Sequence, residues 1–274
     1  MNQNTYSKAL TIAGSDSGGG AGIQADLKTF SALGCYGSSV IVALTAQNTT
    51  SVNDIHQPDP EFTRAQLRAV LDDIGSDAVK IGMLFSTEII NVVAEELKRY
   101  DARNIVLDTV MVAKSGDKLL QDNAKNALVE QLMPLADIIT PNVSEAEVLL
   151  ERKITTYQQM EDGARDLLNT GANAVMLKGG HLHEEDKSRD CLVLNMHNQP
   201  TVLWFDDTRI DTPNTHGTGC TYSSAIAAGL AKGLKIEDAV SEAKKYIAKA
   251  IRAGAGYKLG KGHGPVHHFH EYWN

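Results

Sequence analysis

The sequence predicts an α/β fold with a mostly parallel central sheet, because strand-like apolar runs alternate with helical segments and end in a hairpin-like edge. Six short runs have the composition of buried strands, at residues 9–13, 39–44, 78–81, 105–107, 137–139 and 174–177. Strands that alternate with helices form βαβ units, so we expect these six to lie parallel in one sheet.

Helical periodicity fills the segments between several of these runs. Three apolar stripes have the spacing of one helical face: Ile23, Leu27 and Phe30; Ile89, Val93 and Leu97; and Ala124, Leu128 and Leu132. Further along, Thr155 and Gln158 are spaced as a capping box. Gly171 is then expected to end the helix that begins there.

The pattern changes after Lys178. Residues 191–210 look like short strands joined by a turn at residues 198–200, and we expect them to add an antiparallel edge to the sheet. Two helices should follow, at 219–232 and 236–253, before an irregular tail rich in glycine and histidine. No long linker, repeat or low-complexity block interrupts the chain, so a single domain spanning 1–274 is the simplest organisation.

Composition narrows the classes of function. The chain has 274 residues, 42% hydrophobic and 22% charged, which suits a globular domain with a sizeable core. Its formal net charge of -8 argues against a nucleic-acid partner, which usually demands a basic field. The longest apolar stretches are too short to span a membrane, and the polar N-terminus carries no secretion signal. Three cysteines, Cys35, Cys191 and Cys220, form no CxxC pair, so we expect a reducing cytoplasm.

A glycine-rich loop, AGSDSGGGAG at 13–22, lies between the first strand and the first helix. Ligands of parallel sheets bind at the carboxyl ends of strands, and glycines let the backbone approach them closely. A plain flexible turn is the alternative. The loop does not match G-x-G-x-x-G, and no G-x-x-x-x-G-K-[ST] occurs, so neither a dinucleotide site nor a P-loop is predicted.

A second glycine turn, HGTGC at 216–220, opens a helix near the C-terminus. Free N–H groups of Gly217, Thr218 and Gly219 and the helix dipole should meet at one point and form an anion hole. Such a hole suits the charge on a transferring phosphoryl group. Cys220 falls in the first helical turn, where its thiol pKa should be lowered. The alternative for Cys220 is an ordinary buried cysteine.

Other polar residues follow predicted strands. Asn142 and Glu145 come after the run at 137–139, where Glu145 could act on Mg²⁺ through water or simply complement the helix dipole. Lys178 precedes two glycines and could reach a phosphate as a point charge. Asp108 ends another strand and could hold a metal or substrate, or cap the next turn. For Lys80 we favour a structural role.

Histidines gather near the C-terminus at positions 263, 267, 268 and 270. No carboxylate or cysteine pattern accompanies them, so a solvated tail is favoured over a metal site. His181 and His183 lie in a polar loop and are treated in the same way.

Taken together, these motifs resemble the hydroxymethylpyrimidine/phosphomethylpyrimidine kinase family of thiamine biosynthesis. The match runs nearly end to end and consists of AGSDSGGGAGIQAD at 13–26, TAQNT at 45–49, VKIGM at 79–83, DTVMVAKSG at 108–116, TPN at 140–142, LKGGH at 177–181 and HGTGC at 216–220. One departure is visible, since the family usually has proline where Thr109 stands here. Threonine restores a backbone N–H and frees φ, which could alter the local turn.

The resemblance implies a ribokinase-like fold, a three-layer αβα sandwich, and ATP-dependent phosphorylation of 4-amino-5-hydroxymethyl-2-methylpyrimidine and of its monophosphate. It implies that Gln47 reads the aminopyrimidine, in a pocket lined by Gly14, Asp16, Met83 and Val110. It also implies that Lys178 and Asn142, with Thr218, face the ATP phosphates, that Asp108 and Glu145 hold Mg²⁺, and that Cys220 stands where related sugar kinases carry an aspartate base.

Two other functions stay open at this point. A pyridoxal or pyridoxine kinase is the nearest, because related enzymes with a Gly-Thr-Gly-Cys turn phosphorylate those vitamins. A non-catalytic ligand-binding homologue is the second, although the intact anion hole and Lys178 argue against it. The resemblance also implies a homodimer. The loops at 114–117 and 181–187 are polar enough to move.

Overall fold

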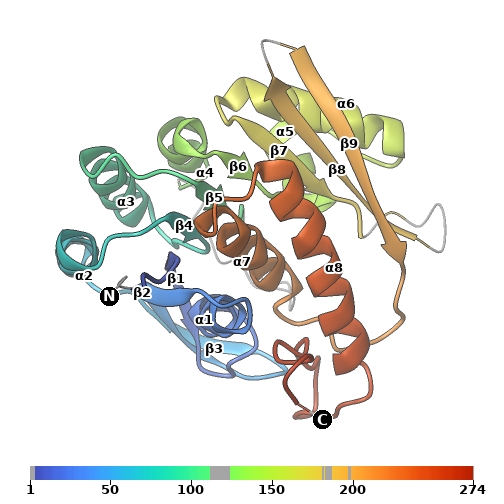
Figure 1. Cartoon of the computed structure of the whole chain (residues 1–274), viewed down its shortest axis with the longest axis horizontal. Helices are drawn as coiled ribbons and strands as arrows, with labels where there is room; N and C mark the ends of the chain where they lie inside the picture. The colour runs from blue at the N-terminus through green and yellow to red at the C-terminus, as the bar shows by residue number, and fades with distance from the viewer. Residues whose placement is uncertain (1–3, 112–123, 181, 183–186, 197–198, 274) are drawn as a thin grey trace.

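A single nine-stranded sheet forms the centre of the molecule (Figure 1). The computed structural model describes residues 4–111, 124–180, 182, 187–196 and 199–273. The strand order is β3-β2-β1-β4-β5-β6-β7-β8-β9, and the six strands from β2 to β7 in that order run parallel. These six are β1 (Lys8–Asp16), β2 (Tyr36–Gln47), β4 (Ala78–Ile81), β5 (Ile105–Leu107), β6 (Ile138–Ile139) and β7 (Ala174–Lys178).

Antiparallel strands close both edges of the sheet. β3 (Val52–His56) pairs with β2, and the hairpin of β8 (Lys187–Met196) and β9 (Gln199–Thr208) extends the sheet from β7. The predicted turn was placed too late, because Gln199 and Pro200 already belong to β9. Proline is tolerated there because β9 is an edge strand, where a missing N–H breaks no inner ladder.

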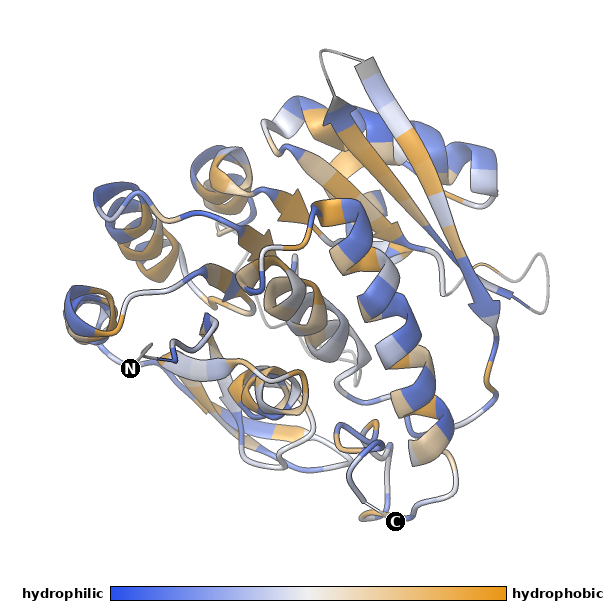
Figure 2. Cartoon of the chain, in the orientation of Figure 1, coloured by the Kyte–Doolittle hydropathy of each residue, from blue (hydrophilic) through white to orange (hydrophobic). Residues whose placement is uncertain are grey.

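Helices cover both faces of the sheet, which confirms the predicted three-layer sandwich. One face carries α1 (Gly22–Ala32), α7 (Thr218–Ala231) and α8 (Ile236–Gly254), and the other carries α2 (Pro60–Asp73), α3 (Thr87–Arg99), α4 (Ala124–Ala127), α5 (Val143–Leu150) and α6 (Tyr157–Leu167). Successive strand residues serve opposite layers: Val106 packs with the α7 side, and Ile105 and Leu107 with the other. Apolar residues accordingly line the inner faces of the helices (Figure 2).

The helical stripes behave as expected, with two local differences. Ala124, Leu128 and Leu132 are all buried, but the segment passes from α4 into a π-helical turn, Leu128–Leu132, and a short 3₁₀ turn. The capping box predicted at Thr155 is wrong by one residue. Thr156 caps α6 by accepting from the backbone N–H of Gln159, whose side chain accepts in turn from the N–H of Thr155. Gly171, with φ of 95°, ends the 3₁₀ extension of that helix.

The C-terminal tail is irregular, as predicted, but it is only partly solvated: His263 is exposed, as expected, whereas His267, His268 and His270 are not. His268 is buried, its Nε2 lies 3.0 Å from Thr221 Oγ1, and burial lowers its pKa to about 4. Its backbone carbonyl accepts a 2.6 Å hydrogen bond from Tyr246 of α8. Flat imidazole rings pack well against aromatic neighbours, as His267 does between Tyr257 and Trp273. The expectation failed because composition alone does not reveal that α7 and α8 leave a surface for the tail.

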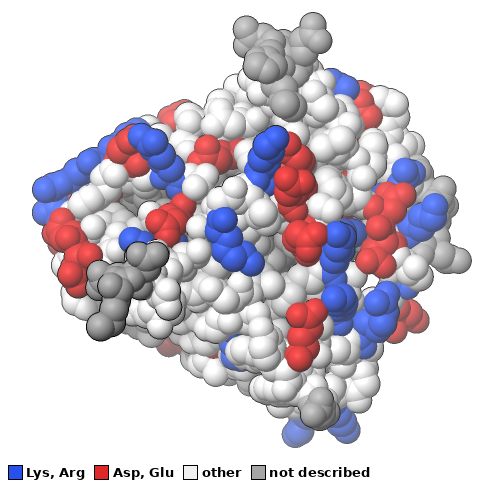
Figure 3. Space-filling view, viewed as in Figure 1, with Lys and Arg blue, Asp and Glu red and all other residues white. Residues whose placement is uncertain are grey.

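Charges of both signs are interspersed on the face shown in Figure 3. Many of them are paired; Arg64, for example, contacts Glu61, Glu95 and Glu96 within 3.2 Å. Among the described residues, every helix is too short or too polar to span a lipid bilayer.

Candidate active site

A deep cleft of about 1250 Å³ opens where the parallel strands end. This is the position at which sheets of this kind bind ligands. All site residues named from the sequence line it: Gly14, Asp16, Gln47, Met83, Asp108, Val110, Asn142, Glu145, Lys178, Gly217, Thr218, Gly219 and Cys220. The fold therefore brings residues from seven separate motifs to one cavity. The loops at 114–117 and 181–187, which we expected to move, lie wholly or largely outside the described residues.

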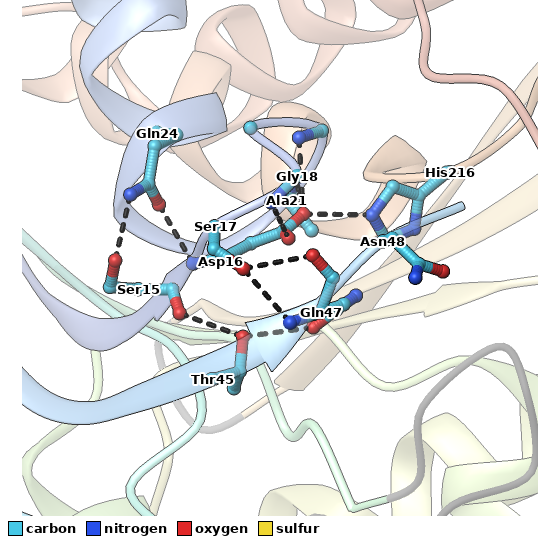
Figure 4. Close-up of polar contacts among 12 residues, drawn as sticks. Ser15, Asp16, Ser17, Gly18, Ala21, Gln24, Thr45, Gln47, Asn48 and His216 are labelled. Atoms are coloured by element: carbon cyan, nitrogen blue, oxygen red, sulfur yellow. Dashed lines mark hydrogen bonds and ion pairs between the residues drawn. The ribbon is translucent and has the colours of Figure 1, made fainter. Parts of the chain in front are cut away.

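One end of the cleft is built from the ends of β1, β2 and β4. Gly14 follows a register shift in β1, and a Cβ there would stand 2.5 Å from Met83 Cε, so a side chain at this position would push the end of the methionine aside. Gln47 ends β2, with its side-chain oxygen 3.2 Å from Thr45 Oγ1. Its backbone is held by Ser17, whose hydroxyl donates to the Gln47 carbonyl and accepts from the Gln47 N–H, both at 2.8 Å (Figure 4).

Asp16 shapes the glycine-rich loop from within. Its carboxylate accepts the backbone N–H groups of Gly18, Gly20 and Ala21 at 2.8–3.0 Å, and it lies 2.9 Å from His216 Nε2. Burial disfavours the ionised carboxylate, but His216 and the N–H donors outweigh it and hold the pKa of Asp16 below its ordinary value. Asp16 thus lines the cleft, but its carboxylate already interacts with the N–H groups of the loop and with His216.

The second glycine turn opens α7 in the same cleft. Gly217 is its N-cap with φ of 78°, and no side chain caps the helix. Thr218 turns its hydroxyl back to the carbonyl of Thr215, at 2.8 Å. The Thr218 N–H donates to the same carbonyl, at 3.3 Å, so one of the three N–H groups that we expected to be free already has a partner. An anion in the cleft would depend on the other N–H groups of this turn.

A charged cluster lies directly beside this helix start. Lys178 Nζ, at the end of β7, is 3.0 Å from Asp108 Oδ1, which also accepts from Thr140 Oγ1. A Cβ on Gly219 would stand 3.5 Å from Lys178 Nζ and 3.7 Å from Asp108 Oδ2. Burial opposes the charge on Asp108, but Lys178 and Lys80 prevail and lower its pKa. The lysine and the helix dipole therefore act on the same volume.

Glu145 adds a second carboxylate to this cluster. Asn142 and Glu145 form a capping box at the start of α5, each side chain accepting the other's backbone N–H at 2.9 Å. Thr109 also donates its hydroxyl to Glu145 Oε2, at 3.1 Å, so the residue that departs from the family's proline supports the site. Burial and the nearby Asp108, against Lys178, raise the pKa of Glu145 to about 7.

Replacing Glu145 with glutamine should change how stability depends on pH. Between pH 4.5, the ordinary value, and about 7, the folded protein retains a proton that the unfolded chain has released. Stability from this group therefore falls as pH rises through that window, and Glu145→Gln should gain stability relative to the parent between pH 5 and pH 8. Urea unfolding of the ligand-free protein at both pH values tests this. Parallel curves for the two proteins would contradict the assignment.

The predicted lowering of the Cys220 thiol pKa is wrong. Burial raises it to about 11, with Lys80 acting in the opposite direction and Asp26 and Asp108 adding to the rise. The helix start is present as expected, but the dense surroundings and two carboxylates outweigh its dipole. The thiol is therefore protonated at neutral pH.

Several functional residues escaped the sequence analysis. His216 pairs with Asp16, and Ser223 donates to Asp108 Oδ2 at 3.2 Å. The sequence positions of both residues could have identified them, since His216 belongs to the second glycine turn and Ser223 lies one helical turn after Gly219. Lys80, for which we favoured a structural role, forms a fully buried ion pair with Asp26 at 2.9 Å. Thr11 and Ser224 donate to the same carboxylate.

Comparisons with known proteins agree on one family. The family model described as phosphomethylpyrimidine kinase matches residues 16–267. The chain is 51% identical over 274 residues to a hydroxymethylpyrimidine/phosphomethylpyrimidine kinase of Rhizobium meliloti, covering 97% of this chain and 98% of the relative. It is 50% identical to the Escherichia coli protein of the same name, with the same coverage of both chains.

Solved structures with this fold include kinases of two vitamins. The pyridoxal kinase of Bacillus subtilis in complex with ADP superposes with a TM-score of 0.90 and 39% identity, over 98% of this chain and 100% of that one. A phosphomethylpyrimidine kinase from Clostridium difficile gives a TM-score of 0.77 and 46% identity, over 89% and 99%. The pyridoxal kinase of Staphylococcus aureus, solved with AMP-PCP and pyridoxal, gives 0.87 and 34%, over 97% and 94%.

Proposed function

The chain belongs to the phosphomethylpyrimidine kinase family, and on that premise we propose that it transfers the γ-phosphoryl group of ATP to 4-amino-5-hydroxymethyl-2-methylpyrimidine and then to its monophosphate, in thiamine biosynthesis. The observation that carries the proposal is one cleft that is lined both by Gln47 and by the start of α7 beside Lys178.

The acceptor binds at the end formed by β1, β2 and β4. The Gln47 amide can donate and accept at once, which suits a ring nitrogen beside an exocyclic amine. Met83 and Val110 supply apolar contacts for the ring, and Gly14 leaves the space that they need. Fixing a small rigid ring in this way places its hydroxymethyl oxygen with little loss of conformational entropy at the moment of reaction.

ATP occupies the other part of the cleft. Ile210, Ile247 and Ile251 offer an apolar wall for the adenine. The phosphates then reach Asn142, Lys178, Thr218 and the other N–H groups that open α7. The positive end of the helix and the Lys178 ammonium both stabilise negative charge, and burial strengthens their effect.

Asp108 and Glu145 have the chemistry that Mg²⁺ requires. Magnesium prefers oxygen ligands and is usually held by one or two carboxylates together with substrate phosphates. No group of three or more His, Cys, Asp or Glu side chains gathers as a metal site in the described part of the chain, which suits a metal shared with ATP. The raised pKa of Glu145 also indicates that an added cation would stabilise its ionised carboxylate. Bound there, the ion would neutralise phosphate charge.

The reaction is an in-line displacement at the γ-phosphorus. A bond forms from the acceptor oxygen, the bond to the ADP oxygen breaks, and the amides of residues 217–220 hold the group that moves. The hydroxyl proton leaves late in a loose transition state, so positioning outweighs base strength. In the second step the acceptor is a phosphate oxygen, which is already charged at neutral pH. Both steps therefore suit a site without a strong base.

Replacing Cys220 with alanine should therefore lower kcat by less than about tenfold, well short of the ~10²-fold that loss of a general base costs. A thiol with a pKa of about 11 carries its proton at pH 7.5 and does not accept another from the substrate. Steady-state kinetics with both acceptors measure this. A loss of ~10²-fold or more in Cys220→Ala, with Cys220→Ser partly active, would restore the base assignment.

Pyridoxal phosphorylation is the second candidate, because structures with TM-scores of 0.90 and 0.87 are those of pyridoxal kinases. An ATP-consumption assay with the pyrimidine alcohol, its monophosphate, pyridoxal and pyridoxine separates the possibilities. We expect turnover on both pyrimidines with kcat/KM above that for either vitamin. Greater activity on pyridoxal would favour the second candidate, and no activity on any acceptor would favour a ligand-binding homologue.

Three further expectations remain predictions: one domain over residues 1–274, a homodimer, and a cytoplasmic location. Light scattering of the purified protein tests the second of these.

A further inference from the structure

The two glycine turns of the cleft interlock, although they are 200 residues apart in sequence. A Cβ on Gly217 would collide with the carbonyl oxygen of Gly20, and a Cβ on Gly20 would collide with the His216 ring. The glycines are therefore needed for contact between the two turns as well as for their own backbone shapes. The loop behind the acceptor pocket and the turn that opens α7 touch directly.

A chain of hydrogen bonds and peptide links crosses this contact (Figure 4). Gln47 is tied through its backbone to Ser17, which follows Asp16 in the glycine-rich loop. Asp16 accepts from three N–H groups of that loop and lies 2.9 Å from His216 Nε2. Because a carboxylate only accepts, Nε2 must donate. His216 directly precedes Gly217, so this chain of bonds runs from the residue that reads the acceptor to the helix N-cap.

The C-terminal segment 261–266 closes the same contact from outside. Next to Gln47 and Asn48, Thr49 Oγ1 accepts the N–H groups of Lys261 and Gly262, at 3.2 and 3.1 Å, and the Thr49 carbonyl accepts from His263. Later in the same segment, the carbonyl of Gly264 accepts the N–H of His216 at 3.0 Å. The carbonyl of His216 in turn accepts the N–H of Val266. Segment 261–266 thus forms hydrogen bonds both with Thr49, next to the acceptor pocket, and with His216, at the start of α7.

Asn214 fixes the segment to α8. Its buried amide donates to the carbonyls of Gly254, at 2.8 Å, and Tyr257, at 2.6 Å, and its oxygen accepts from Gly264. A Cβ on Gly264 would collide with that oxygen, and a Cβ on Gly262 would collide with the Thr49 carbonyl. These close approaches show that segment 261–266 is tightly packed against its neighbours.

We propose that the Asp16–His216 pair and segment 261–266 form a clasp that sets the separation between the acceptor pocket and the anion-binding turn, which makes His216 and Thr49 positioning residues. The proposal rests on the function proposed above. Its physical basis is that an in-line transfer needs the attacking oxygen about 3 Å from phosphorus, and a misplacement of about 1 Å costs roughly 10²-fold in rate. Neither residue takes part in the chemistry itself.

The test compares two substitutions at one position. His216→Leu removes the donor to Asp16, whereas His216→Gln can place its amide nitrogen near the position of Nε2. We expect His216→Leu to lower kcat/KM for the pyrimidine alcohol by about tenfold or more, mainly through kcat. His216→Gln should recover most of this loss. Thr49→Val, which removes the acceptor for two tail N–H groups, should act in the same direction.

Tyr272→Phe is the matched control, because Tyr272 anchors the tail to the carbonyl of Ala32, outside the residues that line the cleft. It should leave the kinetics at the level of the parent. Parental kinetics in His216→Leu would overturn the proposal. So would equal losses in His216→Leu and His216→Gln that follow a common fall in thermal midpoint, because that pattern means a purely structural role. Absence of turnover in the parent protein itself would instead refute the proposed function.

Discussion

Replacing Lys178 with methionine should lower kcat by about 10²–10³-fold, the cost of removing one preorganised group that stabilises transition-state charge. Its ammonium lies beside the first turn of α7, within reach of the volume where the phosphoryl group moves. Methionine keeps most of the side-chain volume but none of the charge. Steady-state kinetics at saturating ATP and acceptor measure the loss in kcat directly.

The substitution also leaves Asp108 buried without its nearest cation. Breaking such a pair costs about 3–5 kcal/mol of stability, so a simple loss of folding must be excluded. The thermal midpoint of Lys178→Met is therefore measured, and kcat is determined at a temperature at which the variant is folded. A parental kcat per folded molecule would show that Lys178 serves the fold and does not act on the phosphates.

Replacing Gly217 with alanine should abolish at least 99% of turnover, about a 10²-fold loss in kcat, because the turn that presents the anion-binding N–H groups can no longer form. Two effects act together. Alanine at φ of 78° costs about 1–2 kcal/mol, and its Cβ would collide with the carbonyl of Gly20. The helix start must then move away from Lys178. Kinetics and the thermal midpoint of the variant are the measurements.

Gly233→Ala provides the matched control. Gly233 has φ of 83°, but a Cβ there meets nothing within 4 Å, and the residue does not line the cleft. It should therefore show a similar cost in backbone strain with kcat close to that of the parent. If both alanine variants lost stability alone and kept full turnover, the turn at Gly217 would not be the anion-binding element.

Local patterns in the sequence were sufficient for most of the fold. The strands at 78–81 and 105–107 have the predicted bounds, because each is a short apolar run that is buried on both faces. β2 proved longer than its apolar core, since its outer residues are only half-buried and carry no such signal. The capping box at α6 shifted by one residue because Thr155 and Thr156 are chemically equivalent in sequence.

The candidate site was likewise predicted only in part from the sequence. Motifs at the ends of strands identified Asp108 and Lys178 as candidate site residues, and the family resemblance added Gln47. All three line the cleft, since strand ends of a parallel sheet meet at one edge. Electrostatic states were less predictable. The Cys220 thiol pKa was expected to fall because a helix start is a local feature, yet it rises because burial and the carboxylates Asp26 and Asp108 come from other parts of the chain.

By itself, the sequence determined the six parallel strands, several of the helices, the two glycine turns and the family to which the chain belongs, but neither β3 nor α2. Only the tertiary structure decided that these turns interlock through Asp16 and His216, that the histidine-rich tail packs against them, and that Thr109 supports Glu145. The reason is physical. Periodicity and turn chemistry depend on neighbours along the chain, whereas burial, charge and steric contact depend on neighbours in space, which the fold alone brings together.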